Sequence, residues 1–217
     1  IRYATSVSLL DQQGLLDSDD FSRVNFRSNI DADVTNTTKL SFDVSGRDEK
    51  INSVAGEEVF RWLVSAKPDL APIKFSNGGY SSGPAYLTLS DNGYRRKRNQ
   101  VFQGRIQLEQ QLPIDGLSVK GIISYDKTFT DNKNWSFLKI PFYTINKADG
   151  TFEESAYGAD GASSLYEDHN DYQSITYEAH LNYKKKVGNN DFTGLVLYTQ
   201  TGEKWNFLSA RRKEFKL

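Results

Sequence analysis

A strict two-residue alternation of polar and apolar side chains is the feature that most restricts the fold of this chain. Between Phe21 and Val34, every second position from Arg23 to Asp33 is charged or an asparagine. The positions between them are mainly apolar, including Phe26 and Ile30. Successive side chains of a β-strand point to opposite faces, so the pattern predicts a strand with one polar and one apolar face. A helix would scatter the apolar residues around its circumference.

Other segments repeat this alternation. The predicted strands are 1–11, 21–34, 39–46, 99–112, 117–130, 171–186 and 191–205. Short turns at 35–38, 113–116 and 187–190 alternate with longer connections at 12–20, 47–98 and 131–170. The turns therefore lie at one end of the sheet and the long loops at the other, which predicts an all-β, antiparallel up-and-down meander of about seven strands. Within the long loops, 56–66 is predicted to be a short helix, and an Asp149-Gly150 turn predicts a hairpin of 142–145 with 151–153.

Composition excludes several classes of protein. The 217 residues include no Cys and two His, and the net charge is −1. Disulfides, cysteine nucleophiles, thiolate metal sites and nucleic acid as the main partner are therefore not expected, and we predict no metal or cofactor. No apolar run approaches the roughly 18 residues of a transmembrane helix. The strands of a transmembrane β-barrel are only half apolar, so this composition is compatible with one.

The alternation alone fits either a membrane barrel or a soluble, secreted β-sandwich such as a carbohydrate-binding module. Three features favour the barrel. Several strands run near 14 residues, whereas globular strands peak at about 5–6. The loops are asymmetric in length, as in outer-membrane barrels. The apolar-face aromatics gather toward strand ends, as interfacial girdles would, namely Phe102, Tyr125, Phe129, Tyr177 and Tyr183.

Two segments carry a more specific signal. Residues 10–16 (LDQQGLL) followed by 21–31 (FSRVNFRSNID) resemble the SusC/RagA family of TonB-linked, or TonB-dependent, outer-membrane transporters. The turn at 35–40 and the strand at 191–198 also fit. The resemblance implies a barrel of about 22 strands around a plug domain. Residues 1–217 would then be one partial transmembrane β-barrel domain with extracellular loops 47–98 and 131–170, and the plug and remaining strands would lie outside this chain. The start at Ile1 fits this expectation of a fragment.

The resemblance also implies a function. It predicts import of oligosaccharides or peptides across the outer membrane of a Gram-negative bacterium, without enzymatic chemistry. The implied partners are a SusD-like surface lipoprotein, outer-membrane lipid, and TonB, which would act through the plug or N-terminal part that this chain lacks. An enzyme would need a nucleophile or a carboxylate pair in a cleft. The spacing of Asp31 and Asp33 fits a glycosidase, but every polar strand face offers such pairs.

Two sets of side chains are candidates for binding. The first would face the lumen and contact cargo or the plug, or else pair across strands, and consists of Arg23, Arg27, Asp31, Arg105, Glu109, Glu178 and His180. Within it, Arg23 and Arg27 could form bidentate bonds to plug carboxylates. The second set would stack on sugars or pack a peptide, or else pack locally or against the lipoprotein, and consists of Trp62, Tyr80, Tyr86, Trp135 and Tyr143. The basic runs 95–98 and 184–186 are interpreted as solvated strand ends, with anionic lipid headgroups as the alternative contact.

Overall fold

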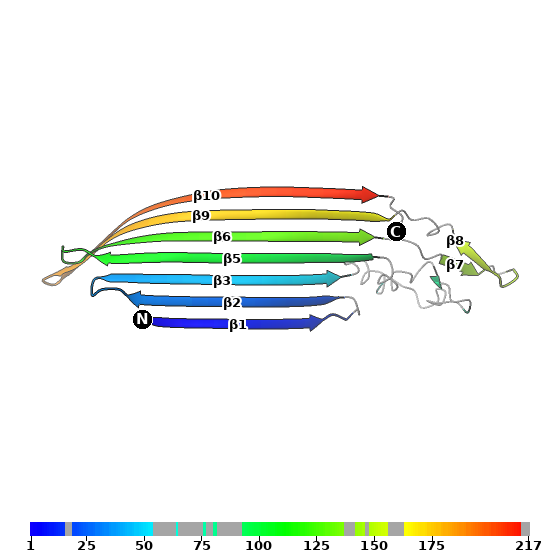
Figure 1. The fold of residues 1–217 in the computed structure, drawn as a ribbon, viewed down its shortest axis with the longest axis horizontal. Helices are drawn as coiled ribbons and strands as arrows, with labels where there is room; N and C mark the ends of the chain where they lie inside the picture. The colour runs from blue at the N-terminus through cyan, green and yellow to red at the C-terminus, as the bar shows by residue number, and fades with distance from the viewer. Residues whose placement is uncertain are drawn as a thin grey trace.

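In the computed structural model, seven long strands form one antiparallel sheet in the order in which they occur along the chain (Figure 1). The strands are β1 Arg2–Gln13, β2 Asp20–Asp33, β3 Thr38–Ser53, β5 Gly93–Gln111, β6 Leu117–Ser136, β9 Ser164–Val187 and β10 Asn190–Lys213. The structure describes residues 1–15, 19–53, 64, 76, 80–81, 93–136, 142–145, 148–155 and 163–213. The predicted up-and-down meander is confirmed. The helix predicted at 56–66 lies, except for Val64, outside the described residues.

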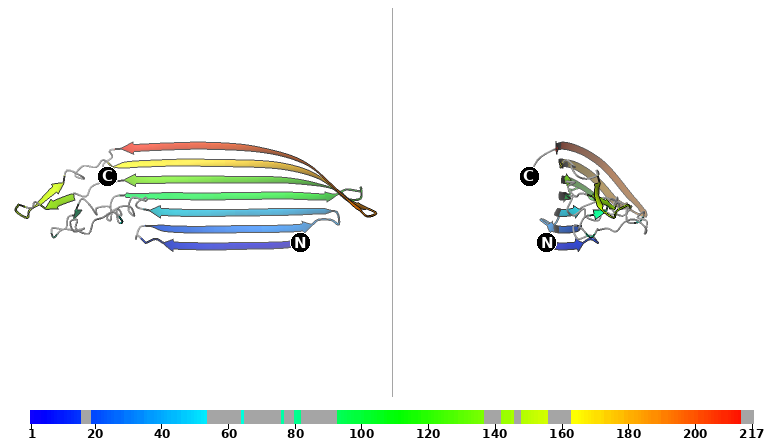
Figure 2. Two further views of the ribbon diagram at one scale, coloured as in Figure 1. Left: turned by 180° about the vertical axis from the view of Figure 1, so that it is seen from behind. Right: turned by 90° about the vertical axis from the view of Figure 1, so that its right-hand side faces the viewer.

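Every neighbouring pair of long strands keeps one register over its whole length, without a bulge. The sheet twists and curves, most visibly where β9 and β10 approach their shared turn (Figure 2). The three predicted short turns lie together at that end of the sheet. In the described part of the chain, no helix is long and apolar enough to cross a lipid bilayer.

The long strands extend further toward the long-loop end than the sequence predicted. β3 continues past Gly46 to Ser53, β5 begins at Gly93, β6 ends at Ser136 and β9 begins at Ser164. The connections between long strands are therefore 54–92 and 137–163, so the loop bounds 47–98 and 131–170 were wrong. The reason is that the added segments carry charged or other polar residues on both faces, which removes the alternation.

Cross-strand ion pairs connect these added segments on the face that is apolar elsewhere. Both oxygens of the Asp48 carboxylate accept hydrogen bonds from Arg98, at 2.9 and 2.8 Å. Two further pairs join the added segments of β6 and β9, namely Lys133–Glu167 and Asp131–His169, and Lys127–Asp171 lies beside them within the predicted strands. The ladder therefore continues into a region where charge complementarity replaces apolar contact between side chains.

A second, small sheet lies beyond the long-loop end of the main sheet (Figure 1). Its strands are β4 Tyr80–Ser81, β7 Phe142–Ile145 and β8 Phe152–Ser155, with β4 parallel to β7 and β8 antiparallel to it. The predicted hairpin is confirmed. At its turn, hydrogen bonds from the Thr151 hydroxyl and backbone N–H to the Asp149 carboxylate lower the pKa of that carboxyl. The parallel pairing of β4 with β7, which joins the two long loops, was not predicted.

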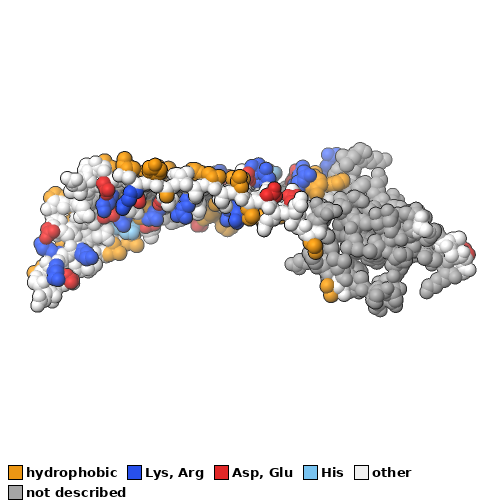
Figure 3. Space-filling model, turned by 90° about the horizontal axis from the view of Figure 1, so that it is seen from below, with side chains coloured by type: hydrophobic (Ala, Val, Ile, Leu, Met, Phe, Trp, Pro, Cys, Tyr) orange, Lys and Arg blue, Asp and Glu red, His pale blue; other side chains and the backbone are white. Residues whose placement is uncertain are grey.

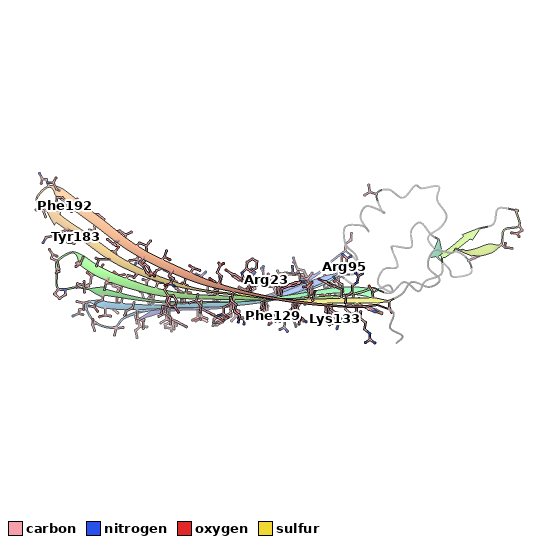
Figure 4. All side chains as sticks on the ribbon, turned by 90° about the horizontal axis from the view of Figure 1, so that it is seen from above. Arg23, Arg95, Phe129, Lys133, Tyr183 and Phe192 are labelled. Atoms are coloured by element: carbon pink, nitrogen blue, oxygen red, sulfur yellow. The ribbon has the colours of Figure 1, made fainter. Side chains whose placement is uncertain are left out.

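The pairing registers divide the main sheet into two chemically different faces, because directly opposed residues share a face. Phe42 in β3, Ile106 in β5 and Ile123 in β6 form one row. We call the face with this row the apolar face, and the opposite one the polar face. Figure 3 shows hydrophobic side chains along one surface of the sheet, which changes to Lys and Arg near the long-loop end. In Figure 4, Arg23 and Arg95 lie on one side of the sheet, and Phe129 and Lys133 on the other.

The sheet has almost no internal core. Among the described residues, Ile122 is the only buried hydrophobic side chain, and it lies on the polar face. On the apolar face, Phe102, Ile106 and Ile123 keep 47–50% of their surface exposed. So large a continuous apolar surface calls for an apolar covering that the described residues do not supply.

The apolar residues form a band of nearly constant width. It covers Val24 to Ala32 in β2 and Leu117 to Tyr125 in β6, about nine residues in each strand. Nine residues span roughly 30 Å at about 3.3 Å per residue. A tilt of about 45° reduces that length to a height of roughly 21 Å, close to the roughly 25 Å apolar band of outer-membrane barrels.

The band also runs diagonally across the strands. The pairing row that begins at Val24 in β2 reaches Phe129 in β6 and Asn206 in β10. On those two strands, however, the continuous band ends earlier, at Tyr125 and Tyr198. Between β2 and β10, the long-loop edge of the band therefore shifts by about eight residues along the strands. The five steps from strand to strand are roughly 4.8 Å each, so the edge is inclined by about 45° to the pairing row. Strands of membrane barrels are inclined to the barrel axis by about 35–45°, so the slope matches that of a barrel wall.

The β5–β6 turn provides a first prediction. Gly116 has φ +83°, and a Cβ at this position would overlap the carbonyl oxygen of Lys184. Its own carbonyl oxygen accepts a hydrogen bond from the Lys184 N–H at 2.7 Å. Replacing Gly116 with Val should destabilise the full-length protein by about 1–3 kcal/mol, because it adds backbone strain and separates β6 from β9. Urea unfolding in detergent measures this loss.

Gly121→Ala is the matched control for that substitution. Gly121 lies within β6, and an added Cβ would have no neighbouring atom within 4 Å. We expect a change of less than about 0.5 kcal/mol, as for exposed substitutions away from special backbone positions. Equal stability of Gly116→Val and Gly121→Ala would contradict the proposed role of the turn.

Candidate functional site

The polar face contains a hollow of about 690 Å³ at the middle of β2, β3, β5 and β6. One pairing row crosses it, from Arg27 through Ser45 and Gln103 to Asp126. Each of these strands contributes polar side chains because alternate residues of a strand point to the same face. The polar and charged residues that line the hollow are Asn25, Arg27, Asn29, Asp43, Ser45, Arg47, Gln103, Arg105, Ser124 and Asp126.

The centre of the hollow is connected by hydrogen bonds between side chains. The Gln103 amide Nε2 donates to the Asp126 carboxylate at 2.9 Å, and the Ser45 hydroxyl donates to Gln103 Oε1 at 3.5 Å. Arg47 forms an ion pair with Glu49 at 3.4 Å on the same strand. These contacts fix the positions of donors and acceptors across three strands.

Two arginines of the hollow, Arg27 and Arg105, make no ion pair among the described residues. Arg27 Nε donates to Asn29 Oδ1, and Arg105 Nη2 donates to Gln107 Oε1, both at 3.3 Å. Neither guanidinium lies within ion-pair distance of a carboxylate among the described residues. A guanidinium forms its strongest hydrogen bonds with carboxylate or phosphate, so the hollow can bind an anionic or oxygen-rich group.

The seven residues predicted to face the lumen all lie on the polar face, but only Arg27 and Arg105 line the hollow. Asp31 accepts a hydrogen bond from the Ser41 hydroxyl at 2.6 Å. Glu109 opposes Lys120, which opposes His180. This second row lies closer to the short turns, and His180 Nε2 is 2.9 Å from a carboxylate oxygen of Glu178. Some of the seven residues therefore interact with residues on neighbouring strands, which is the alternative role predicted for this set.

Arg23 occupies the same face of β2 further toward the long loops. Its guanidinium lies 6.0 Å from the centre of the Phe21 ring. Its Nε is buried and has no hydrogen-bond partner among the described residues. A buried donor without a partner costs free energy, so this position favours an acceptor from a segment that the sheet itself does not supply.

The predicted aromatic set does not form one site. Trp62 and Tyr86 lie outside the described residues. Tyr80 and Tyr143 lie on the paired strands β4 and β7 of the small sheet, where the register sets Tyr80 opposite Phe142 and Tyr143 opposite Ser81. Trp135 lies at the end of β6 on the apolar face, opposite Tyr94, at 5.6 Å between ring centroids. It is thus on the other face of the sheet from the hollow.

Sequence reasoning missed the hollow itself. Asp43, Ser45 and Gln103 lie within the predicted strands 39–46 and 99–112, but no site was predicted there. Their grouping depends on the registers that bring three strands together, and no local motif encodes those registers. The polar alternation placed these residues on the correct face but did not identify their neighbours. In the described ranges, no group of three or more His, Asp or Glu side chains is arranged to hold a metal ion.

Comparison with solved structures gives the same fold. One structure of the RagAB peptide importer, in its closed-closed state, matches with a TM-score of 0.73 and 16% sequence identity, over 98% of this chain. A structure of the RagAB peptide transporter matches with a TM-score of 0.72 and 17% identity, also over 98%. This chain spans 24% of the length of each matched chain. No protein-family model matches the sequence, and no curated protein matches it significantly. The predicted likeness to SusC/RagA transporters is thereby confirmed for the fold.

Proposed function

We propose that this chain forms part of the wall of an outer-membrane β-barrel transporter that imports oligosaccharides or peptides into a Gram-negative bacterium. The observation that carries the proposal is the diagonal apolar band, which is exposed and inclined like the strands of a barrel. Lipid would cover this band, and the polar face with its hollow would line the lumen. The fold likeness to the RagAB peptide importer supports the same assignment.

The hollow supports an interaction with carboxylate or other oxygen-rich groups. Arg27 and Arg105 offer guanidinium donors, while Asp43 and Asp126 offer acceptors for backbone amides or sugar hydroxyls. Peptides carry both carboxylates and backbone amides, and the matched importer takes up peptides. Peptides are therefore the better supported cargo, and oligosaccharides remain the alternative. No nucleophile is activated by a neighbouring base in the hollow, so the proposed role is binding and passage.

Partners follow from the family resemblance of 10–16 and 21–31. A SusD-like lipoprotein would cap the long-loop end, and TonB would act through a plug inside the lumen. The unpartnered Arg23 Nε favours a plug carbonyl or carboxylate as its acceptor. The loop aromatics, Tyr80 and Tyr143 among them, remain candidates for contact with cargo or with the lipoprotein.

A soluble β-sandwich is less well supported. A sandwich buries the apolar face of one sheet against a second sheet about 10 Å away. Among the described residues the large sheet has no such layer on its apolar face, where Val7 and Leu9 are 65% and 76% exposed.

Cysteine labelling in the full-length protein tests the membrane assignment, and the absence of Cys from this chain simplifies it. Ile123 and Ser124 are adjacent in β6 and lie on opposite faces. A Cys at Ile123 should react with a lipid-soluble maleimide in intact membranes and be protected from a water-soluble one. A Cys at Ser124 should show the reverse preference. Labelling of both by the water-soluble reagent alone would exclude a lipid-facing wall.

A further inference from the structure

A second hollow lies on the apolar face, at the edge of the band nearer the long loops, and has a volume of about 530 Å³. In its central row, Phe26 in β2 and Phe102 in β5 flank Gly46 in β3. A Cβ at Gly46 would meet no atom closer than the Val101 carbonyl oxygen, at 3.9 Å. Two exposed aromatic side chains therefore stand on either side of an empty strand position, and we call this hollow the glycine groove.

The width of the glycine groove suits a single alkyl chain. Phe26 and Phe102 stand two strand spacings apart, or about 10 Å between backbones. Ring thickness leaves roughly 6 Å between them, and the Phe102 ring lies over Gly104 of its own strand, so the space above Gly46 admits a hydrocarbon chain. Toward the long-loop end, Val24 and Phe129 line the groove at the two ends of a row that also contains Asp48 and Gln100.

Cations gather directly beyond that end of the groove. Along β3 the same face carries Gly46, Asp48 and Lys50, and Lys50 is directly opposite Arg98 in β5. Like charges in directly opposed positions destabilise a sheet. Asp48 compensates Arg98 through two hydrogen bonds, whereas Lys50 makes no ion pair among the described residues. Next to it, the Arg96 guanidinium stacks 4.2 Å from the centre of the Tyr94 ring.

Beside the glycine groove, β3 and β5 carry more positive than negative charge on this face. On β6 and β9, Lys127, Lys133 and His169 each face a carboxylate and form ion pairs. Above the glycine groove, in contrast, the three cations Lys50, Arg96 and Arg98 face two carboxylates, Asp48 and Asp131, and Asp131 is also paired with His169. The local charge is therefore positive where the groove leaves the apolar band.

We propose that the glycine groove binds one acyl chain of an anionic, phosphate-bearing lipid, whose phosphate lies on Lys50 and Arg98. The inference rests on the proposed function, in which the apolar face contacts lipid. It specifies the class of lipid that binds and the place where it binds. A phosphate near these cations relieves the repulsion between Lys50 and Arg98. The acyl chain fills the space above Gly46 that no side chain of the sheet occupies.

Native mass spectrometry of the delipidated full-length protein in detergent tests this proposal. The probes are phosphatidylglycerol and phosphatidylcholine with identical acyl chains. Wild-type protein should bind phosphatidylglycerol about tenfold more tightly, since each basic side chain near an anionic headgroup contributes several-fold in affinity. Equal affinity for the two lipids would overturn the proposal.

Separate substitutions test the groove and the cations. Gly46→Leu should fill the groove and weaken phosphatidylglycerol binding at least about tenfold. Gly121→Leu, which also adds bulk to open space on the apolar face, should leave it unchanged. Unchanged binding by a folded Gly46→Leu protein would overturn the assignment of the groove.

Lys50→Gln should reduce the preference for phosphatidylglycerol about fivefold and leave phosphatidylcholine binding as it is. Lys204→Gln, on the apolar face of β10, is the control and should have no effect. An unaltered preference in Lys50→Gln would overturn the headgroup assignment. If the membrane assignment itself were wrong, the cysteine of Ile123→Cys would not react with the lipid-soluble reagent. Failure of the membrane assignment can therefore be distinguished from failure of the lipid-binding proposal.

Discussion

Phe42→Arg is expected to reduce the amount of folded protein in the outer membrane at least tenfold. Phe42 lies within the apolar band, in one row with Ile30, Ile106 and Ile123. An arginine on the lipid face near the bilayer midplane costs about 2–4 kcal/mol. Because the sheet has almost no internal core, few other contacts can offset this free-energy cost. The measurement is the folded, heat-modifiable band of the full-length protein in isolated outer membranes.

The neighbouring position supplies the control. Ser41 precedes Phe42 in β3 but lies on the polar face, where its hydroxyl donates to Asp31 at 2.6 Å. In Ser41→Arg, the guanidinium can pair with the Asp31 carboxylate, so we expect near-normal assembly. If both arginine variants assembled equally well, the apolar face would not contact lipid.

Replacing both Arg27 and Arg105 by Gln is expected to lower cargo uptake at least tenfold without loss of folded protein. Hydrogen bonds to charged groups contribute about 1.5–3 kcal/mol each, and the two guanidiniums are cationic donors of the hollow that make no ion pair among the described residues. Glutamine keeps a donor but removes the charge. Uptake of a labelled oligopeptide by cells that carry the full-length variant measures the effect, together with the amount of variant in the membrane.

Lys120→Gln is the matched control for the arginine pair. Lys120 lies on the same polar face but in the row of Glu109 and His180, outside the hollow. Its substitution should leave uptake within about twofold of wild type. Normal uptake by the double arginine variant would show that the hollow neither binds cargo nor positions a segment needed for transport.

The parts of the fold that could be predicted are those with a short-range physical cause. Alternation fixes which residues share a face, so all seven lumen candidates, from Arg23 to His180, lie together on the polar face. Turn chemistry gave the short connections and the Asp149-Gly150 hairpin. The strand ends near 46–53 and 93–98 were missed because charges on both faces erase the alternation, and cross-strand ion pairs maintain the pairing instead.

The strands, their order and the chemistry of each face can be predicted from local sequence, because these depend on residues two positions apart or on adjacent strands joined by turns. The registers, in contrast, are seen only in the folded sheet. They place Arg27, Gln103 and Arg105 in one hollow, and they place Trp135 on the opposite face. They also give the apolar band its slope of about 45°. A slip of one residue in any strand pair would exchange the faces beyond it, so these features arise from the whole sheet.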